Sequence, residues 1–437
     1  MILDLKENNI KVLVCSVNAW NSKVGDNTFP LLLNELPSAN VASLFIREEQ
    51  PDSTACDHYF RISEPRVIRS IIKRSTKTGE CVTRLSSQNT SSHTVELAEH
   101  NKLYSNKQKK RFYYLKLLIR EIIWKFGKWN TPEFESFLDS FKPDVVIYEM
   151  SRYIHLNRIV RYILNRTGAA GIGCFWDDTF TYKQERRIGY KILRFFQRKN
   201  LVKLAKETKE FFAITPKTKS EADAFFKIDC TVLTKPIVTA SMRTEPSCIE
   251  PIRMLYTGNL AIGREKTILS LVKELGKVNR DGVKIRLDIY TKTQLDDAYI
   301  AAYNTEYSCL HAAITQEEVI ALQNQSDVLL FAESFDDKEK IARLSFSTKI
   351  TDYYAAGKCI FAVGNADLAP MELFAGDNSA IIVTNEHELF EGLNKLLDKQ
   401  TILHFANRAY QIGREKYTSD KIKRIFHAVL MRAYSEK

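Results

Sequence analysis

The residues best suited to binding chemistry lie in one stretch, 343–357, between two short apolar runs that indicate buried strands. Ser347 and Thr348 are good N-cap residues for a helix connecting those strands, and a helix start offers free N–H groups and a partial positive charge. Lys349 adds a full charge, and Asp352 follows about one turn later. A diphosphate at the helix start and a ribose at the carboxylate would make a nucleotide site. The same residues also suit a capped crossover helix with an exposed lysine and aspartate.

A second cationic loop follows another predicted strand. It contains Gly258, Asn259, Gly263, Arg264 and Lys266. Glycines let the backbone approach a ligand closely, and arginine can hold a phosphate with two hydrogen bonds. Ligands of doubly wound sheets lie beyond the carboxyl ends of the strands, so both loops can face one diphosphate. Neither a Walker A motif nor, in the first half, a Gly-x-Gly-x-x-Gly motif is present, which disfavours kinases, NTPases and simple dehydrogenases.

The elements that must position these loops alternate as strand and helix along nearly the whole chain. This rhythm predicts an α/β protein with two tandem Rossmann-like domains that face each other across a cleft. We expect an N-terminal domain (1–237), a proline-punctuated linker (238–251), a C-terminal domain (252–415) and a last helix (416–437) that could pack back on the first domain. We expect residues 80–106, which are rich in Ser, Thr and Asn, to form a mobile insertion.

Composition sets limits on the class of protein. The chain has 437 residues, too many for a single core, with 44% hydrophobic and 27% charged residues. Its eight cysteines are scattered, which favours a reducing cytosol and argues against a zinc site, so we predict no metal. The polar N-terminus lacks the pattern of a signal peptide, and no apolar run approaches the roughly 20 residues of a membrane span.

Positive charge is concentrated in one region. Residues 101–200 contain 21 Lys and Arg against 9 Asp and Glu, whereas the whole chain carries +11. Two predicted helices there, 107–129 and 184–212, combine cations with apolar and aromatic stripes. Such helices suit an anionic bilayer surface, although the stripes could instead face the core. The basic patch has no accompanying nucleic-acid signature, so we expect no nucleic acid as a partner.

The two cationic loops also resemble a known family. The runs 256–260 and 347–358 are similar to those of the group 1 (family 4) glycosyltransferases of GT-B fold, and the resemblance is best over 252–415. It implies that the C-terminal domain binds a sugar nucleotide, a UDP- or GDP-sugar, as substrate and without a cofactor. Most members have two glutamates eight residues apart, but here Leu344 stands eight before Asp352, and Glu333 could take the place of the first.

The implied reaction is retaining glycosyl transfer, in which the enzyme supplies positive charge to a departing diphosphate. The predicted catalytic residues are Arg264, Lys349 and Asp177. The residues predicted to bind the nucleotide sugar are Gly258, Asn259, Lys266, Thr291, His311, Glu333, Ser347, Thr348 and Asp352. Candidates for the acceptor, at strand ends or loops of the first domain, are Gly25, Asp26, Glu149, Ser151 and Asp178. Strand-end acids are also common as simple helix caps.

Taken together, these features predict a glycosyltransferase of bacterial surface polysaccharide synthesis, acting on a glycan or lipid-linked acceptor. Its predicted location is cytoplasmic and peripheral to the inner face of the cytoplasmic membrane. Two alternatives remain open at this stage. One is a sugar-nucleotide epimerase of GT-B fold, which would need no acceptor. The other is a non-enzymatic basic binding protein.

Overall fold

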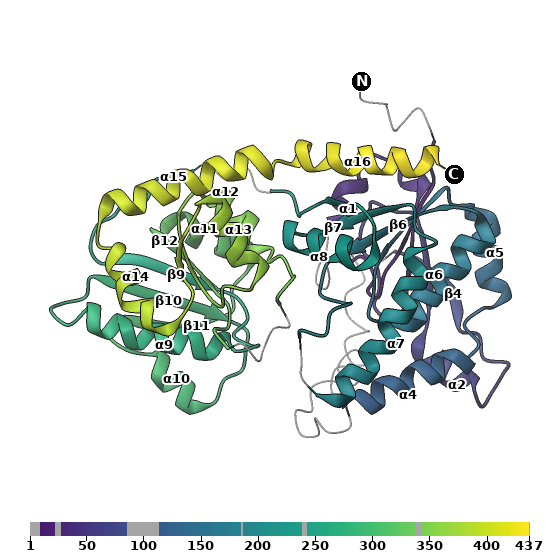
Figure 1. The fold of residues 1–437 in the computed structure, drawn as a ribbon, viewed down its shortest axis with the longest axis horizontal. Coiled ribbons are helices and arrows are strands. Elements are labelled where there is room, and N and C mark those ends of the chain that lie inside the picture. Colours follow the sequence, from purple (N-terminus) through teal and green to yellow (C-terminus); the bar gives the residue numbers. More distant parts are fainter. Residues whose placement is uncertain are drawn as a thin grey trace.

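The computed structural model describes residues 9–21, 28–84, 113–184, 187–237, 243–336 and 342–436. Two α/β halves lie side by side, and two consecutive C-terminal helices run across one side of both (Figure 1). Each half is built on one sheet, and each sheet has an apolar cluster on both of its faces. The predicted fold class, two Rossmann-like domains in tandem, is therefore confirmed.

The first sheet has eight strands in the order β4-β3-β2-β1-β5-β6-β7-β8. Seven of them run parallel, because helices return the chain to the same edge, and β4 is antiparallel to β3. The strands are β1 (Val12–Cys15), β2 (Val41–Phe45), β3 (His58–Ile62), β4 (Gly79–Val82), β5 (Val145–Glu149), β6 (Ala170–Phe175), β7 (Glu210–Ala213) and β8 (Cys230–Val232). Strand β4 corrects the expectation of an irregular insertion from residue 80, while residues 85–112 lie outside the described chain.

The helices of the first half cover both faces of this sheet (Figure 1). They are α1 (Thr28–Leu33), α2 (Glu64–Ser70), α4 (Tyr113–Phe126), α5 (Pro132–Phe141), α6 (Ile154–Thr167), α7 (Ile188–Ala205) and α8 (Pro216–Phe226). The second basic helix is thus shorter than the predicted 184–212, because Glu210 already begins β7.

The second sheet has six strands, all parallel, in the order β11-β10-β9-β12-β13-β14. The strands are β9 (Ile252–Thr257), β10 (Ile285–Thr291), β11 (Ser308–Ala312), β12 (Val328–Ala332), β13 (Cys359–Val363) and β14 (Ile381–Val383). The helices are α9 (Arg264–Val278), α10 (Asp297–Tyr303), α11 (Gln316–Gln325), α12 (Lys349–Ala356), α13 (Ala369–Asp377) and α14 (Leu389–Lys395). The sequence did not predict α10, α13 or α14, each of which has fewer than ten residues.

The last two helices connect the halves. α15 (Lys399–Lys416) packs on the second half, and α16 (Ser419–Ser435) lies over the first (Figure 1). The apolar side of α16 joins the core of the first sheet, where Phe426 stacks on Phe212 with ring centroids 5.8 Å apart. The chain passes between the halves twice, and the two passages are hydrogen-bonded to each other from Ile237 N–H to the Tyr417 carbonyl at 2.8 Å.

Among the described residues, no helix is both long enough and apolar enough to cross a bilayer. The eight cysteines are unpaired.

Candidate functional site

The two predicted cationic loops meet at the carboxyl edge of the second sheet. Gly258 directly follows β9, and Lys349 is the first residue of α12. The Lys349 ammonium lies 4.3 Å from the ring centroid of Tyr256. A β-carbon at Gly258 would lie 2.2 Å from Lys349 Nζ, and the glycine has a φ of +148°. Position 258 therefore requires glycine for two reasons: its φ is positive, and the Lys349 side chain leaves no room for a β-carbon.

Arg264 lies in the same cluster and forms a two-pronged ion pair. Its Nε and Nη2 donate to the two carboxylate oxygens of Glu333, at 2.9 and 2.7 Å. The sequence assigned Arg264 to a diphosphate and Glu333 to a sugar, and the structure places them face to face. Burial, and after it the Arg264 charge, lower the pKa of Lys349 to about 8, while Glu333 acts in the opposite direction. An anion entering this cluster would hold the lysine in its charged form.

The start of α12 differs from the prediction in one respect. Thr348 occupies the N-cap position, but it has helical dihedral angles and its side chain makes no capping hydrogen bond. Ser347 does not cap the helix with its side chain either; its carbonyl accepts from Ile350 N–H at 3.0 Å. Asp352 lies in the first turn, where burial raises the pKa of its carboxyl and Lys235 opposes that shift. Gly357 ends the helix with a left-handed φ of 60°.

A pocket of about 320 Å³ opens between the two halves next to this cluster. From the second half it is lined by Ile262, Arg264, Glu333, Ala342, Ser345, Phe346, Ser347 and Pro370. From the first half it is lined by Glu149, Arg152, Asp177, Asp178, Thr179 and Gln184. Residues predicted for the donor and for the acceptor thus line opposite walls of one pocket.

Two carboxylates dominate the wall that the first half contributes. Glu149 is the last residue of β5, and Asp177 follows β6, the neighbouring strand. Burial, and then the charge of Asp177, raise the pKa of Glu149 to about 7, while Arg152 opposes the shift. Asp177 accepts a hydrogen bond from Ser345 Oγ of the second half. No hydrogen bond or ion pair in the described chain holds the Glu149 carboxylate.

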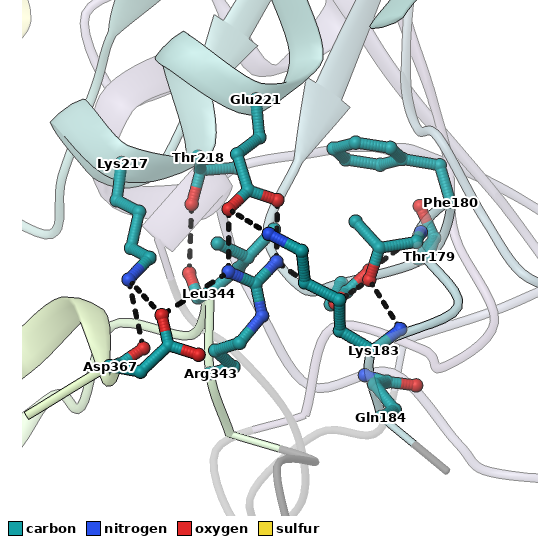
Figure 2. A network of polar contacts seen from close by, with 12 residues as sticks. Thr179, Phe180, Lys183, Gln184, Lys217, Thr218, Glu221, Arg343, Leu344 and Asp367 are labelled. Carbon is teal, nitrogen blue, oxygen red and sulfur yellow. Dashed lines mark hydrogen bonds and ion pairs between the residues drawn. The ribbon is translucent and has the colours of Figure 1, made fainter. Parts of the chain in front are cut away.

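The Asp178 carboxylate already has partners within the protein. Its carboxylate accepts from Thr181 N–H at 2.9 Å and lies 3.5 Å from the fully buried Arg343 of the second half. Arg343 also donates twice to Glu221 of α8, at 2.5 Å each (Figure 2). Asp178 lines the pocket, but its charge is already paired in the interior, and its assignment to the acceptor stays a prediction.

Further contacts hold the segment 343–345 on the first half. Leu344 is fully buried in the first half's core, and its carbonyl accepts from Thr218 Oγ1 at 2.8 Å. Lys217 pairs with Asp367 at 2.7 Å (Figure 2) and with Glu372 at 2.5 Å. The segment that leads into α12 and Lys349 is therefore anchored on the opposite half.

The other predicted residues lie outside the pocket. Ser151 is buried, and its hydroxyl accepts from Tyr153 N–H at 3.2 Å, which is a turn contact before α6. The Asn259 side chain accepts from Ala261 N–H at 2.6 Å within its own loop. Thr291 Oγ1 accepts from Thr293 N–H at 3.1 Å. None of these local contacts points to an acceptor or donor role.

Lys266 and His311 are also separate from the pocket. Lys266 is exposed on the first turn of α9. His311, on the edge strand β11, stacks on Tyr290 at 4.4 Å and pairs with Asp288 at 2.8 Å. The structure places His311 two strands from β9, beyond β10. Gly25 and Asp26 lie outside the described residues.

Sequence reasoning missed several residues of the pocket. Arg152 lines it. Its place three residues beyond the end of β5 could have indicated this, because ligands bind beyond the carboxyl ends of parallel strands. Ser345, which binds Asp177, gave no signal because its partner is 168 residues away. Tyr256 was noticed only as part of a run, yet its ring underlies Lys349. Among the described residues, no group of three or more His, Cys, Asp or Glu is arranged to hold a metal ion.

Comparison with known proteins adds evidence on the fold. No family model and no curated protein matches the sequence. Solved structures do match. An E. coli trehalose-6-phosphate protein bound with UDP-2-fluoro glucose is 11% identical, with a TM-score of 0.57 and coverage of 97% of this chain and 99% of that one. The lipopolysaccharide outer core galactosyltransferase WaaB is 12% identical, with a TM-score of 0.58 and coverage of 97% and 99%.

A third similar structure is an alpha,alpha-trehalose-phosphate synthase (UDP-forming) from Burkholderia xenovorans in complex with glucose-6-phosphate. It is 9% identical, with a TM-score of 0.55 and coverage of 97% of this chain and 100% of that one. These similarities give no support to the epimerase alternative. They extend over both sheets and the crossing helices, and the chain therefore has the two-domain GT-B fold.

Proposed function

We propose that this protein is a glycosyltransferase that moves a sugar from a nucleoside-diphosphate sugar to an acceptor hydroxyl. The observation that carries the proposal is the pocket in which Arg264, clustered with Lys349 and Gly258, lies opposite Glu149 and Asp177. The first wall offers cations where a diphosphate would leave, and the second offers carboxylates where a hydroxyl would attack. Similar structures include enzymes named as sugar transferases and synthases, which supports the same activity.

The donor would bind at the edge of the second sheet. Its diphosphate would lie against Lys349 and Arg264, with the backbone at Gly258 close beneath it, and its ribose would reach Asp352. Glu333, which now pairs with Arg264, would then be released toward the sugar hydroxyls. UDP- and GDP-sugars are the proposed donors, as the family resemblance implies.

The reaction breaks the bond between the anomeric carbon and the diphosphate oxygen and forms a bond to the acceptor oxygen. Negative charge grows on the departing diphosphate, where Arg264 and Lys349 stabilise it more in the transition state than in the ground state. The proton of the acceptor hydroxyl passes to Asp177 or to the departing diphosphate. We propose a retained anomeric configuration, in line with the family resemblance.

Calorimetry on the full chain with UDP, GDP and CMP tests the donor part. We expect UDP or GDP to bind, and the corresponding UDP- or GDP-hexose to be consumed when a mixture of mono- and oligosaccharides is added. Absence of binding by every nucleotide at millimolar concentration, in a chain with an intact thermal transition, would refute the proposal.

A surface of the first half favours membrane association. Its exposed apolar side chains lie on α2, α4 and α7, and α4 contacts both of the other helices. On α4 they form one stripe at helical spacing: Leu115, Ile119, Ile122 and Phe126, exposed by 51, 46, 54 and 58%. On α7 they are Ile188, Ile192, Phe195 and Phe196. The alternative that the α4 stripe faces the core is wrong for these four residues.

Cations surround this apolar surface. Lys73, Lys116, Lys125, Lys191 and Lys199 are exposed on or next to the same three helices. Burying apolar area stabilises by about 25 cal/mol per Å², and each cation near an anionic bilayer contributes about 1 kcal/mol. We therefore propose that the enzyme lies on the inner face of the cytoplasmic membrane and extends a glycan or lipid-linked acceptor of a surface polysaccharide.

Co-sedimentation with liposomes tests this localisation. We expect binding to anionic vesicles that weakens as salt rises, and loss of binding when Leu115, Ile119, Ile122 and Phe126 are all changed to Ser. The matched control changes exposed apolar residues of the second half, Ile249, Ile300 and Phe390, to Ser. Equal binding by both variants, or no binding by the wild type, would contradict the proposal.

A further inference from the structure

The acceptor wall of the pocket carries more carboxylates than cations. Glu149 and Asp177 end neighbouring strands, and Asp177 acts on the ionisation of Glu149, so the two carboxylates lie close together. Arg152 is the one described cation on the first half's part of the lining. Both carboxylates act on this arginine, because the charges of Glu149 and Asp177 each raise its pKa. Arg152 can offset one carboxylate, so the wall is net negative once Glu149, whose pKa is about 7, has lost its proton.

The cations of the donor wall do not change this balance. Arg264 is paired with Glu333, and Lys349 lies behind it over the ring of Tyr256. Once a donor diphosphate is bound, its negative charge would offset both cations, which lie together in one cluster. An acceptor then enters a pocket whose uncompensated charges are carboxylates.

The neighbouring charges are also unavailable. Arg343, which is fully buried, is held by Glu221 (Figure 2) and by Asp178. Lys183 pairs with Glu221 at 3.2 Å. Arg194 donates to the Asp178 carbonyl at 3.2 Å and to Gln184 at 2.8 Å, so it supports the loop rather than facing the pocket. Cations that could otherwise bind a phosphate are thus engaged.

We propose that the sugar reacting in this pocket is neutral or carries an amino group, and that a sugar phosphate is excluded. This inference rests on the proposed function and names its acceptor class. Carboxylate oxygens accept hydrogen bonds from sugar hydroxyls and form charge-assisted ones with an ammonium group, whereas a dianionic phosphate beside them is repelled. A phosphate elsewhere in the acceptor, for example in a lipid carrier, must lie outside the pocket.

Matched sugar pairs test the proposal on the full chain saturated with UDP. The probes are glucose, galactose and mannose, their 6-phosphates, and glucosamine and galactosamine, with binding measured by saturation-transfer NMR. We expect at least one unphosphorylated sugar to bind, and to bind at least tenfold more tightly than its 6-phosphate. Tighter binding of any 6-phosphate than of its parent would overturn the inference. So would the absence of binding by every unphosphorylated probe in a chain that binds UDP.

Two substitutions sharpen the test. Glu149→Gln and Asp177→Asn together remove both charges with little change of shape, so we expect the discrimination against 6-phosphates to fall at least fivefold. Asp139→Asn, on the exposed side of α5, is the control and leaves the ratio unchanged. An unchanged ratio in the double variant would overturn the role of these carboxylates. If the chain binds GDP and not UDP, the same sugar pairs are measured with GDP. Failure to bind either nucleotide counts against the proposed function and not against the acceptor class.

Discussion

The two edges that meet at the pocket are built alike but charged oppositely. Each is the carboxyl edge of a sheet whose central strands are parallel, and each presents residues from strand ends or from the loops and helix starts that follow them. The second half's edge carries Arg264 and Lys349 over a glycine, and the first half's edge carries Glu149 and Asp177. The fold thus places both edges at the pocket. The charge of each edge then determines whether it can bind the donor or the acceptor of a group transfer.

The strongest way to break this contrast is to remove the central cation of the donor edge. Lys349→Ala is expected to lower kcat by about 10²-fold or more, because a preorganised cation that meets developing charge contributes several kcal/mol. Steady-state kinetics measure it. The control, Lys266→Ala, is expected to remain near wild type, since Lys266 is exposed outside the pocket. Equal losses of kcat in both variants would show that Lys349 contributes no more to catalysis than an exposed lysine outside the pocket.

The close approach at the donor edge can be tested by adding one carbon. Gly258→Ala places a methyl group on Lys349 Nζ, so we expect nucleotide affinity to fall by roughly 30-fold, about 2 kcal/mol. Gly282→Ala is a matched control: its φ of +123° is also left-handed in sign, but its β-carbon would meet nothing within 4 Å. Calorimetry separates the two. Similar losses would show that backbone strain alone is responsible.

The ribose assignment predicts a smaller effect of a different kind. Asp352→Ala is expected to raise the donor KM by about tenfold, roughly 1.4 kcal/mol, with little change in kcat. A ribose contact exists in the ground state and in the transition state alike, so its loss weakens both equally. An unchanged donor KM would remove Asp352 from the site.

The smallest expected effect is a pH dependence of nucleotide binding. The charged form of Lys349 binds the diphosphate, and its pKa in the free protein is about 8, so affinity falls as pH rises through 8. Between pH 7 and pH 8 the expected loss is about twofold. In Lys349→Arg the cation stays charged, and that component of the pH dependence should disappear. An identical decline in the variant would assign the titration to another group.

The sequence predicted what depends on neighbours along the chain. The strand–helix alternation, the glycine after β9 and the end of α12 at Gly357 all follow from local patterns, and the fold prediction is confirmed. The roles of the site residues stay predictions. Contacts between distant segments could not be predicted from the sequence: Arg343 binds Glu221 across 122 residues and also lies 3.5 Å from the carboxylate of Asp178.

The surroundings of a side chain also could not be predicted from the local sequence. The stripe on α4 has the same spacing whether it faces core or solvent, and only the packed structure shows that Leu115 and Phe126 are exposed. Similarly, a strand-end glutamate can be a cap or a reactive group. The position of Glu149 beside Asp177 depends on the pairing of β5 with β6, which no single segment specifies.

The double passage of the chain between the halves matters for protein engineering. A donor domain cannot be exchanged at one junction, because α16 lies after it in sequence and belongs to the other half's core. A chimera needs two cuts, before β9 and between Tyr417 and Ser419, so that the donor domain is grafted as an insert into a continuous host. The insert also brings Leu344, which packs into the core of the first half. The host must therefore keep a cavity in its core that matches this side chain.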